Sequence, residues 1–222
     1  MSRSTLVLFD IDGTLMRGAG AHHKEALLEG VRRVTGREAS FDAIDTAGKL
    51  DMDLIAALVQ STNSELQSEV ARESQTVYLA NCTHDLSPFV LRGARELITE
   101  LSNRGAALAL VTGNLSAIGW RKMELAGLKQ FFHSGAFSEE APTRAAIAEL
   151  ATRRARHENH ATADCRVSLI GDHRNDIEAA KTNGFRSIAV ASGPMPAAEL
   201  LTFAPDIFLH SLADLDAGIL FS

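Results

Sequence analysis

The stretch LFDIDGTLM (residues 8–16) ends an apolar run with two aspartates, Asp10 and Asp12, which are followed by a glycine and a threonine. Carboxylates held this close repel each other, and the repulsion shifts their protonation unless a cation or a reaction makes use of both. A simple turn needs one aspartate at most. The stretch therefore predicts a buried strand that is followed directly by reactive side chains.

Composition sets broad limits on the class of protein. The chain has 222 residues, of which 45% are apolar and 5% aromatic, and its net charge is −6. This length suffices for one large core, or for a core domain with a smaller companion. Charges of both signs are interspersed, without the basic stripe that nucleic-acid binders present, so we expect no nucleic-acid partner.

Cysteine usage and the N-terminus bear on the compartment. Cys82 and Cys165 lie far apart and form no CxxC pattern, which indicates a reducing compartment without disulfides. The apolar part of residues 1–10 is too short for a signal peptide, and no stretch approaches the ~18 apolar residues of a membrane span. We expect a cytoplasmic protein that has no membrane partner and acts as a monomer or homodimer.

Short apolar runs without strict alternation are typical of strands covered on both faces. They span residues 5–9, 106–111, 166–170, 187–191 and, more weakly, 206–210. Patterns of helical periodicity lie between them, over residues 92–105, 115–128 and 143–156. This alternation predicts an α/β fold, with a doubly wound, mostly parallel sheet that is wrapped on both faces by helices.

Residues 16–86 interrupt the alternation. Here helical patterns follow one another directly, over residues 22–36, 51–60 and 64–82. We expect a small α-helical domain (16–86) inserted after the first strand of a core formed by residues 1–15 and 87–222. Two domains joined in this way are expected to move relative to each other.

Polar side chains follow several predicted strands at the point where each strand ends. They are Asp10 and Asp12 after the first strand, Thr112, Gly113 and Asn114 in VTGN (111–114), and Asp172 and Asp176 in IGDHRND (170–176). In an open parallel sheet, ligands bind beyond the carboxyl ends of the strands, near the switch point. We therefore expect these clusters to converge on one crevice.

The residue types indicate a chemistry. Asp10, Asp12 and Asp172 offer the hard oxygen ligands that suit Mg²⁺, and a cation would also remove the repulsion between the first two. A carboxylate that attacks a phosphate dianion needs positive charge beside it, from a metal, a basic side chain and backbone N–H groups. The sequence offers all of these.

The segments DIDGTL (10–15), VTGN (111–114) and GDHRND (171–176) resemble the first, second and fourth signature motifs of the haloacid dehalogenase-like (HAD) hydrolases. Their order, their spacing and the helical insertion all fit, so the resemblance covers nearly the whole chain. It implies a Rossmann-like core with an inserted cap. It also implies that Asp10 is the nucleophile that becomes aspartyl-phosphate, and that Asp12 is the acid–base.

The resemblance implies further roles. Phosphate would be bound by Gly13, Thr112, Gly113, Asn114 and Arg144; Mg²⁺ would be bound by Asp10, Asp12 and Asp172, with Asp176 behind them. Arg144 is assigned because many members carry a lysine in the third motif, whereas AFSEEAPTRAAIAELA (136–151) has this arginine at the start of its helical pattern. Arginine keeps the charge and adds bidentate geometry, but it does not substitute freely for lysine.

In the predicted cap, DTAGKLDMD (45–53) resembles the Gly-Arg-Thr-Asp segment of phosphatases akin to phosphoglycolate phosphatase. Lys49 would then meet the distal anion of the substrate. His23 is expected at a solvated helix start, and His173 either at the edge of the metal or in solvent. Asp12 must donate and then accept a proton, so we expect its pKa to lie above the ordinary value.

These residues predict a Mg²⁺-dependent phosphatase that hydrolyses a small phosphorylated metabolite. Two alternatives stay open: a sugar-phosphate mutase of the same superfamily, and a regulatory protein that binds phosphate without turnover. A dehalogenase is less favoured, because relatives that attack carbon do not need the acid–base carboxylate of Asp12. Phosphonate cleavage is also less favoured, because no cap lysine is placed for a Schiff base.

Overall fold

A parallel sheet forms the centre of the protein. The computed structural model describes residues 3–222, and within them six strands pair in the order β3-β2-β1-β4-β5-β6, each pair parallel. The strands are β1 (Arg3–Phe9), β2 (Ala107–Val111), β3 (Ser134–Ala136), β4 (Ala161–Gly171), β5 (Arg186–Val190) and β6 (Ile207–Leu209). The predicted α/β fold with a doubly wound parallel sheet is confirmed.

Helices cover both faces of this sheet because successive residues of a strand point to opposite faces. Leu6 and Leu8 of β1 pack in a cluster with α6 and α7, whereas Val7 and Phe9 pack in a second cluster with α4 and α5. The helices outside the insertion are α4 (Ala94–Asn103), α5 (Ser116–Leu125), α6 (Arg144–His157), α7 (Arg174–Thr182) and α8 (Ala197–Thr202). Covering on both faces explains why these strands lack polar alternation.

The central strand aligns the ends of its two neighbours. Phe9, the last residue of β1, is in register with Leu110 of β2 and Ile170 of β4. The N–H of Asp10 donates to the carbonyl of Ile170 (3.0 Å). The loops that follow these strands therefore start at the same edge of the sheet, at the switch point where ligands bind in such folds.

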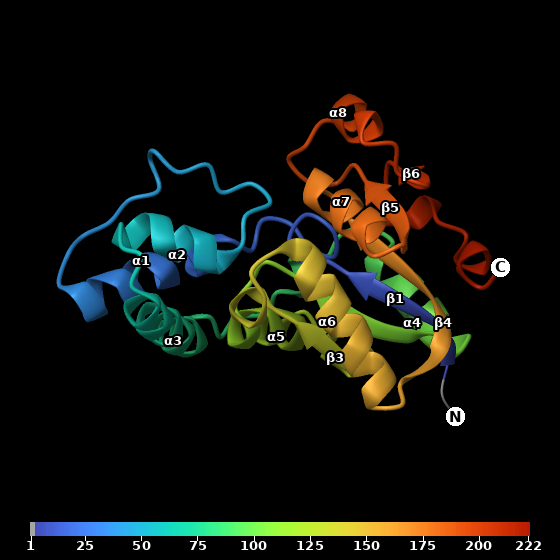
Figure 1. The fold of residues 1–222 in the computed structure, drawn as a ribbon, viewed down its shortest axis with the longest axis horizontal. Helices are drawn as coiled ribbons and strands as arrows, with labels where there is room; N and C mark the ends of the chain where they lie inside the picture. The colour runs from blue at the N-terminus through green and yellow to red at the C-terminus, as the bar shows by residue number, and fades with distance from the viewer. Residues whose placement is uncertain (1–2) are drawn as a thin grey trace.

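The insertion after β1 is helical. It contains α1 (Ala21–Thr35), α2 (Asp51–Val59) and α3 (Ser64–Asn81). Figure 1 shows these helices gathered at one end of the molecule, away from the sheet, with a long loop between α1 and α2. We refer to residues 16–86 as the cap; the domain limits at 15/16 and 86/87 stay a prediction.

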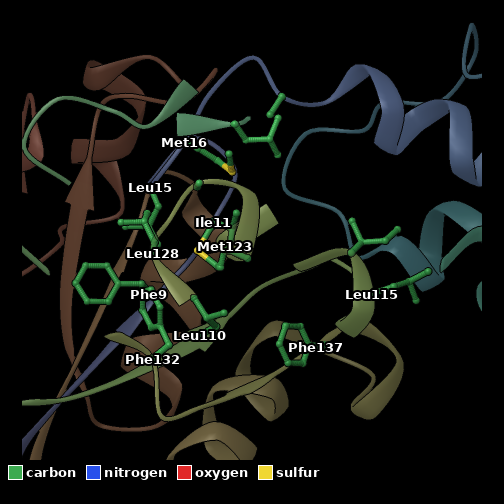
Figure 2. Packing of buried hydrophobic residues seen from close by; sticks show 14 of the residues in the cluster. Phe9, Ile11, Leu15, Met16, Leu110, Leu115, Met123, Leu128, Phe132 and Phe137 are labelled. Atoms are coloured by element: carbon green, nitrogen blue, oxygen red, sulfur yellow. The ribbon is translucent and has the colours of Figure 1, made fainter. Parts of the chain in front are cut away.

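The apolar interior is continuous between the sheet and the cap. Phe9 and Phe132 meet edge to face, with ring centroids 6.0 Å apart. Figure 2 shows them beside Ile11 and Leu110, on the face of the sheet that α4 and α5 cover. The same buried cluster extends to Leu27 of α1 and to other apolar residues of the cap helices. Burial of this apolar surface is the main favourable contribution to folding.

The observed elements follow the sequence pattern closely, but helices α7 and α8 and strand β3 were not among the predicted ranges. Strand β3 is only three residues long and consists of Ser134, Gly135 and Ala136, so it gives no apolar run. In the described part of the chain, no helix has the length and hydrophobicity that crossing a bilayer requires.

Candidate active site

A cavity of about 350 Å³ lies between the carboxyl ends of the strands and the cap. Its walls come from the loops after β1, β2, β4 and β5, from helix α1 and from the loop that leads into α2. The predicted site residues that line it are Asp10, Asp12, Gly13, Lys49, Gly113, Asn114, Arg144 and Asp172. Thr112 and Asp176 lie buried next to these residues.

Three buried carboxylates meet at one side of the cavity. Oxygens of Asp10, Asp172 and Asp176 lie within 4.8 Å of one another. Burial raises the pKa of Asp10 well above its ordinary value; Arg144 acts against this rise, and the neighbouring acids add to it. Burial and the charge of Asp176 likewise raise the pKa of Asp172 to about 7. The cluster is therefore short of positive charge.

Arg144, the first residue of α6, supplies the one cation that contacts this cluster among the described residues. Its guanidinium pairs with Asp10 (Nη2 to Oδ1, 3.1 Å) and with Asp176 (Nε to Oδ1, 3.1 Å), and it donates to the carbonyl of Val111 (3.3 Å). The planar fork reaches two carboxylates at once, which a lysine ammonium does not do as well. This geometry agrees with the role predicted for Arg144.

Asp12 lies in a different environment, although it is only two residues from Asp10. Its Oδ2 accepts from Lys122 Nζ (2.6 Å) and from Asn114 Nδ2 (2.8 Å). Burial, the largest single influence, raises the pKa of Asp12, but Lys122, His23 and Asn114 together lower it by more, so the pKa lies below its ordinary value. Our expectation of a raised pKa was wrong, because it did not include Lys122, which lies 110 residues from Asp12 in the chain.

The position of Asp12 also bears on the predicted metal ligands. Among the residues that the structure describes, the acidic cluster that could hold an ion contains Asp176 and not the Asp12 carboxylate. That carboxylate points to Lys122 and Asn114 instead. The Asp12 carboxylate therefore lies outside this cluster, whereas Asp176, which we expected behind the metal ligands, lies within it.

The loop after β2 carries the predicted phosphate ligands. Thr112 Oγ1 accepts from Asn114 Nδ2 (2.8 Å), so the two side chains hold each other in place. Gly113 lies under the cap, where a Cβ would come 2.7 Å from the Lys49 carbonyl oxygen. Gly13, with φ +92°, leaves no room for a side chain beside the Asp172 carboxylate. Both glycines are required by close approach of the chain.

The cap closes the cavity from the opposite side. Exposed Lys49 lines it, as expected, and Arg17 and Lys24 add positive charge that sequence reasoning missed. His173 is buried and caps the N-terminus of α7, where its Nδ1 accepts from the N–H of Asn175 (3.3 Å). It lines the cavity and does not face solvent.

Three further polar residues were missed. Lys122 of α5 is fully buried and binds Asp12, Asn114 Oδ1 (2.7 Å) and His23 Nδ1 (3.1 Å). His23 in turn contacts the carboxylate of Asp51 (2.8 Å). The side chain of His23 is only 12% exposed, so the expected solvated position was wrong. A lysine four residues after buried Ile118, on the apolar face of a helix, was the one sequence signal of this network.

The acidic cluster fits a divalent cation. Its ligands are hard carboxylate oxygens, which Mg²⁺ prefers. Arg144 balances one of the three negative charges of Asp10, Asp172 and Asp176, and an ion of charge +2 would balance the other two. Within the described residues Asp176 Oδ1 accepts no hydrogen bond of good geometry, although Arg144 Nε lies 3.1 Å from it. The residues present therefore fit the metal that the sequence predicted, and Mg²⁺ in particular is taken up below.

The raised pKa of Asp172 predicts that the free energy of unfolding depends on pH. Unfolded Asp172 loses its proton near pH 4, whereas the native residue keeps it up to a pKa of about 7. Between these values the native state binds more protons, so its stability falls as the pH rises. Without metal, urea unfolding should show this loss as the pH rises from about 4 to about 7 for the wild type, and a smaller loss for Asp172→Asn.

Magnesium should reverse the effect. Added to the wild type, it should raise the free energy of unfolding more at pH 8 than at pH 5, because it binds the deprotonated carboxylates of the native state. Equal pH profiles for wild type and Asp172→Asn would contradict this account of the cluster.

Comparison with known proteins identifies the family. The model of the haloacid dehalogenase-like hydrolase family matches residues 7–190. The chain therefore belongs to the haloacid dehalogenase-like hydrolases, as the motifs predicted, and the prediction of a hydrolytic enzyme is confirmed.

Two curated relatives carry a more specific name. The chain is 29% identical over 224 residues to a phosphoglycolate phosphatase of Vibrio vulnificus (strain CMCP6), covering 95% of this chain and 93% of the relative. It is 28% identical over 231 residues to a phosphoglycolate phosphatase of Caulobacter vibrioides, covering 94% and 87%. These relatives support the predicted class of HAD-type phosphoric monoester hydrolase.

Solved structures show the same fold. A β-phosphoglucomutase from Clostridium difficile superposes with a TM-score of 0.72 at 17% identity, covering 99% of this chain and 96% of that one. A structure described as a predicted phosphatase from Clostridium acetobutylicum gives a TM-score of 0.71 at 18% identity, with full coverage of both chains. Mutases and phosphatases thus share this architecture, so the fold alone does not decide between them.

Proposed function

We propose that this protein is a Mg²⁺-dependent phosphatase that hydrolyses a small phosphate monoester through an aspartyl-phosphate on Asp10. One observation carries the proposal: two aspartates at the end of one strand have opposite environments. Asp10 is paired with Arg144 in the acidic cluster, whereas Asp12 is bonded to Lys122. Pairs of acids whose environments push their pKa values apart are typical of sites with divided catalytic roles.

In the first half-reaction, an Asp10 oxygen attacks phosphorus and the P–O bond to the alcohol breaks. Arg144, Asn114 and the backbone N–H groups near Gly113 would hold the phosphate oxygens and offset their charge. Asp12 would give its proton to the departing alkoxide. A bound Mg²⁺, held by Asp10, Asp172 and Asp176, would screen the negative charge that nucleophile and phosphate share.

In the second half-reaction, water attacks the phosphorus of aspartyl-phosphate and Asp10 leaves as a carboxylate. Asp12 takes the proton of this water, so it returns to its protonated form and phosphate is released. Because the pKa of Asp12 lies below its ordinary value before substrate binds, its carboxylate is suited to act as the base in this step. In the first step, the arriving phosphate dianion would favour the protonated form.

We propose that the substrate carries a second anionic group. Basic side chains of the cap, Arg17, Lys24 and Lys49, line the cavity together with the acidic residues. The volume of about 350 Å³ suits a small metabolite. Phosphoglycolate, the substrate in the name of the curated relatives, has this chemistry. We also propose a cytoplasmic location and a monomer or homodimer.

A sugar-phosphate mutase is the second candidate. The β-phosphoglucomutase from Clostridium difficile has the same fold, and a mutase would use the same acid–base pair and return the phosphoryl group to a sugar. A phosphate-binding regulator is less favoured, because a protein that only binds an anion gains nothing from buried acids aimed at it.

A product assay tests the proposal. Purified protein is incubated with phosphoglycolate, β-glucose 1-phosphate, nucleotides and p-nitrophenyl phosphate, each with Mg²⁺ and with a chelator. A phosphatase releases inorganic phosphate in step with substrate loss, and only with metal. Conversion of the sugar phosphate to an isomer without phosphate release would favour the mutase. No reaction of any ester under any metal would contradict both enzymes.

Arg144→Lys is expected to lower kcat/KM by about 10²-fold, although it keeps the charge. A lysine ammonium replaces a fork that reaches both Asp10 and Asp176, so nucleophile and phosphate lose their fixed geometry. Arg153→Lys, on the exposed side of the same helix, is the matched control and should leave kcat/KM within twofold. Equal values for Arg144→Lys and the control would remove Arg144 from the site.

A further inference from the structure

The cap touches the predicted phosphate-binding loop through one buried carboxylate. Asp51, the first residue of α2, accepts on Oδ2 from the N–H of Leu115 (2.8 Å), and its own N–H donates to the carbonyl of Gly113 (2.8 Å). Asn114 stands between these two core residues. One residue of the cap therefore holds the backbone on both sides of a predicted phosphate ligand.

The same carboxylate is connected to the acid–base through side chains. Asp51 Oδ2 lies 2.8 Å from His23 Nε2, and His23 Nδ1 lies 3.1 Å from Lys122 Nζ. Lys122 also binds Asp12 (2.6 Å) and Asn114 (2.7 Å). The path Asp51–His23–Lys122–Asp12 is thus unbroken.

The hydrogens of this path are determined by donor and acceptor counting. An ammonium has three hydrogens and no acceptor, and Lys122 directs them to Asp12, Asn114 and His23. His23 Nδ1 must then accept, so its Nε2 carries the hydrogen that is donated to Asp51. Every member has a partner, which makes the network rigid; a partly satisfied network in a buried place would be costly.

The network crosses from the cap to the core. His23 belongs to α1 and Asp51 to α2, whereas Asp12, Asn114 and Lys122 belong to the sheet side of the cavity. If the cap lifted, Leu115 N–H would lose its acceptor, and Lys122 would lose one of the bonds that orient it. The arrangement around Asp12 is therefore complete only when the cap rests on the core.

We propose that Asp51 and His23 are positioning residues that make the placement of Asp12 depend on cap closure. Neither needs to touch the substrate: Asp51 fixes the loop around Asn114, and His23 fixes Lys122, which holds Asp12. This inference rests on the proposed phosphatase function. It adds that the cap supplies part of the acid–base site as well as the contacts to the substrate.

Leaving-group dependence tests the proposal. Asp12 must protonate an alkoxide, whereas p-nitrophenolate leaves without help. Asp51→Ala should therefore lower kcat/KM by about 10²-fold for phosphoglycolate, and at least fivefold less for p-nitrophenyl phosphate. A structural defect that reduces the fraction of active protein would lower both values equally. Asp51→Asn can keep an oxygen at the position of Oδ2, so it should recover most of the activity with both esters.

Two control variants test whether the effect is specific to Asp51 and His23. Asp53→Ala removes an exposed carboxylate from the same helix, and His22→Leu removes the neighbouring, more exposed histidine. Both should stay within twofold of wild type. His23→Leu should repeat the unequal loss of Asp51→Ala, and it provides the test if Asp51→Ala does not fold.

The outcomes distinguish this inference from the proposed function. A wild type inactive towards both esters would overturn the phosphatase and the inference together. An active wild type with equal losses for the two esters, or with Asp51→Ala and His23→Leu no different from their controls, would overturn the inference alone. Unequal losses with recovery by Asp51→Asn support it.

Discussion

Asp10→Asn should lower turnover by roughly 10⁴-fold or more, the size of loss found when an enzyme loses its nucleophile. An amide oxygen does not form the acyl-phosphate that the proposed first step requires. The fold should survive, because burial raises the pKa of the native carboxyl well above its ordinary value and the neutral amide avoids that cost. Phosphate release and urea unfolding measure the two effects.

A mutant that is inactive and unfolded would not test the role of Asp10, so the second measurement is needed. We expect Asp10→Asn to be at least as stable as the wild type at pH 8 without metal. The comparison variant is Asp164→Asn, which changes an exposed aspartate of β4 and should keep full turnover. Turnover by Asp10→Asn within tenfold of wild type would exclude Asp10 as the nucleophile.

Asp12→Asn should lower turnover by about 10²–10⁴-fold, the usual contribution of a general acid–base. Its amide oxygen can still accept from Lys122, so the hydrogen-bond network and the fold should be kept. The loss of kcat/KM, which reports the first half-reaction, should be greater for phosphoglycolate than for p-nitrophenyl phosphate, because in that step only the alkoxide needs a proton. Steady-state rates with both esters measure this difference.

The variants Asp10→Asn and Asp12→Asn should also be blocked at different steps of the reaction. With p-nitrophenyl phosphate, Asp12→Asn should still transfer the phosphoryl group to Asp10, but it lacks the base that activates water. Phosphoenzyme should therefore accumulate in this variant and be absent from Asp10→Asn. Near-normal turnover by Asp12→Asn would remove Asp12 from the mechanism.

The framework of the fold could be predicted because it depends on local pattern. Strand β1 and the acids after it lie within one short stretch, and apolar runs mark strands that are covered on both faces. The convergence of Asp10, Thr112 and Asp172 follows from parallel topology alone, since the carboxyl ends of neighbouring strands share an edge. Strand β3 was missed because three small residues carry no such pattern.

The partners of Asp12 could not be predicted, because they depend on contacts between distant segments. Lys122 is 110 residues from Asp12 and 99 from His23. In LSAIGWRKMELAGL (115–128) its place four residues after Ile118 puts it on the apolar face of the helix, but the pattern does not say which carboxylate it contacts. Without it, repulsion between two neighbouring acids predicts a raised pKa for Asp12. Its ammonium, 2.6 Å away, reverses the direction of that shift together with His23 and Asn114.

Acid quenching during turnover tests the central claim most directly. The wild type and Asp12→Asn are mixed with p-nitrophenyl phosphate and Mg²⁺, quenched within the first turnovers, digested and mapped by mass spectrometry. The account predicts one added phosphoryl group on the peptide that contains Asp10, more abundant in Asp12→Asn and absent without Mg²⁺. Phosphate release with no labelled peptide, or with the label on another residue, would contradict it.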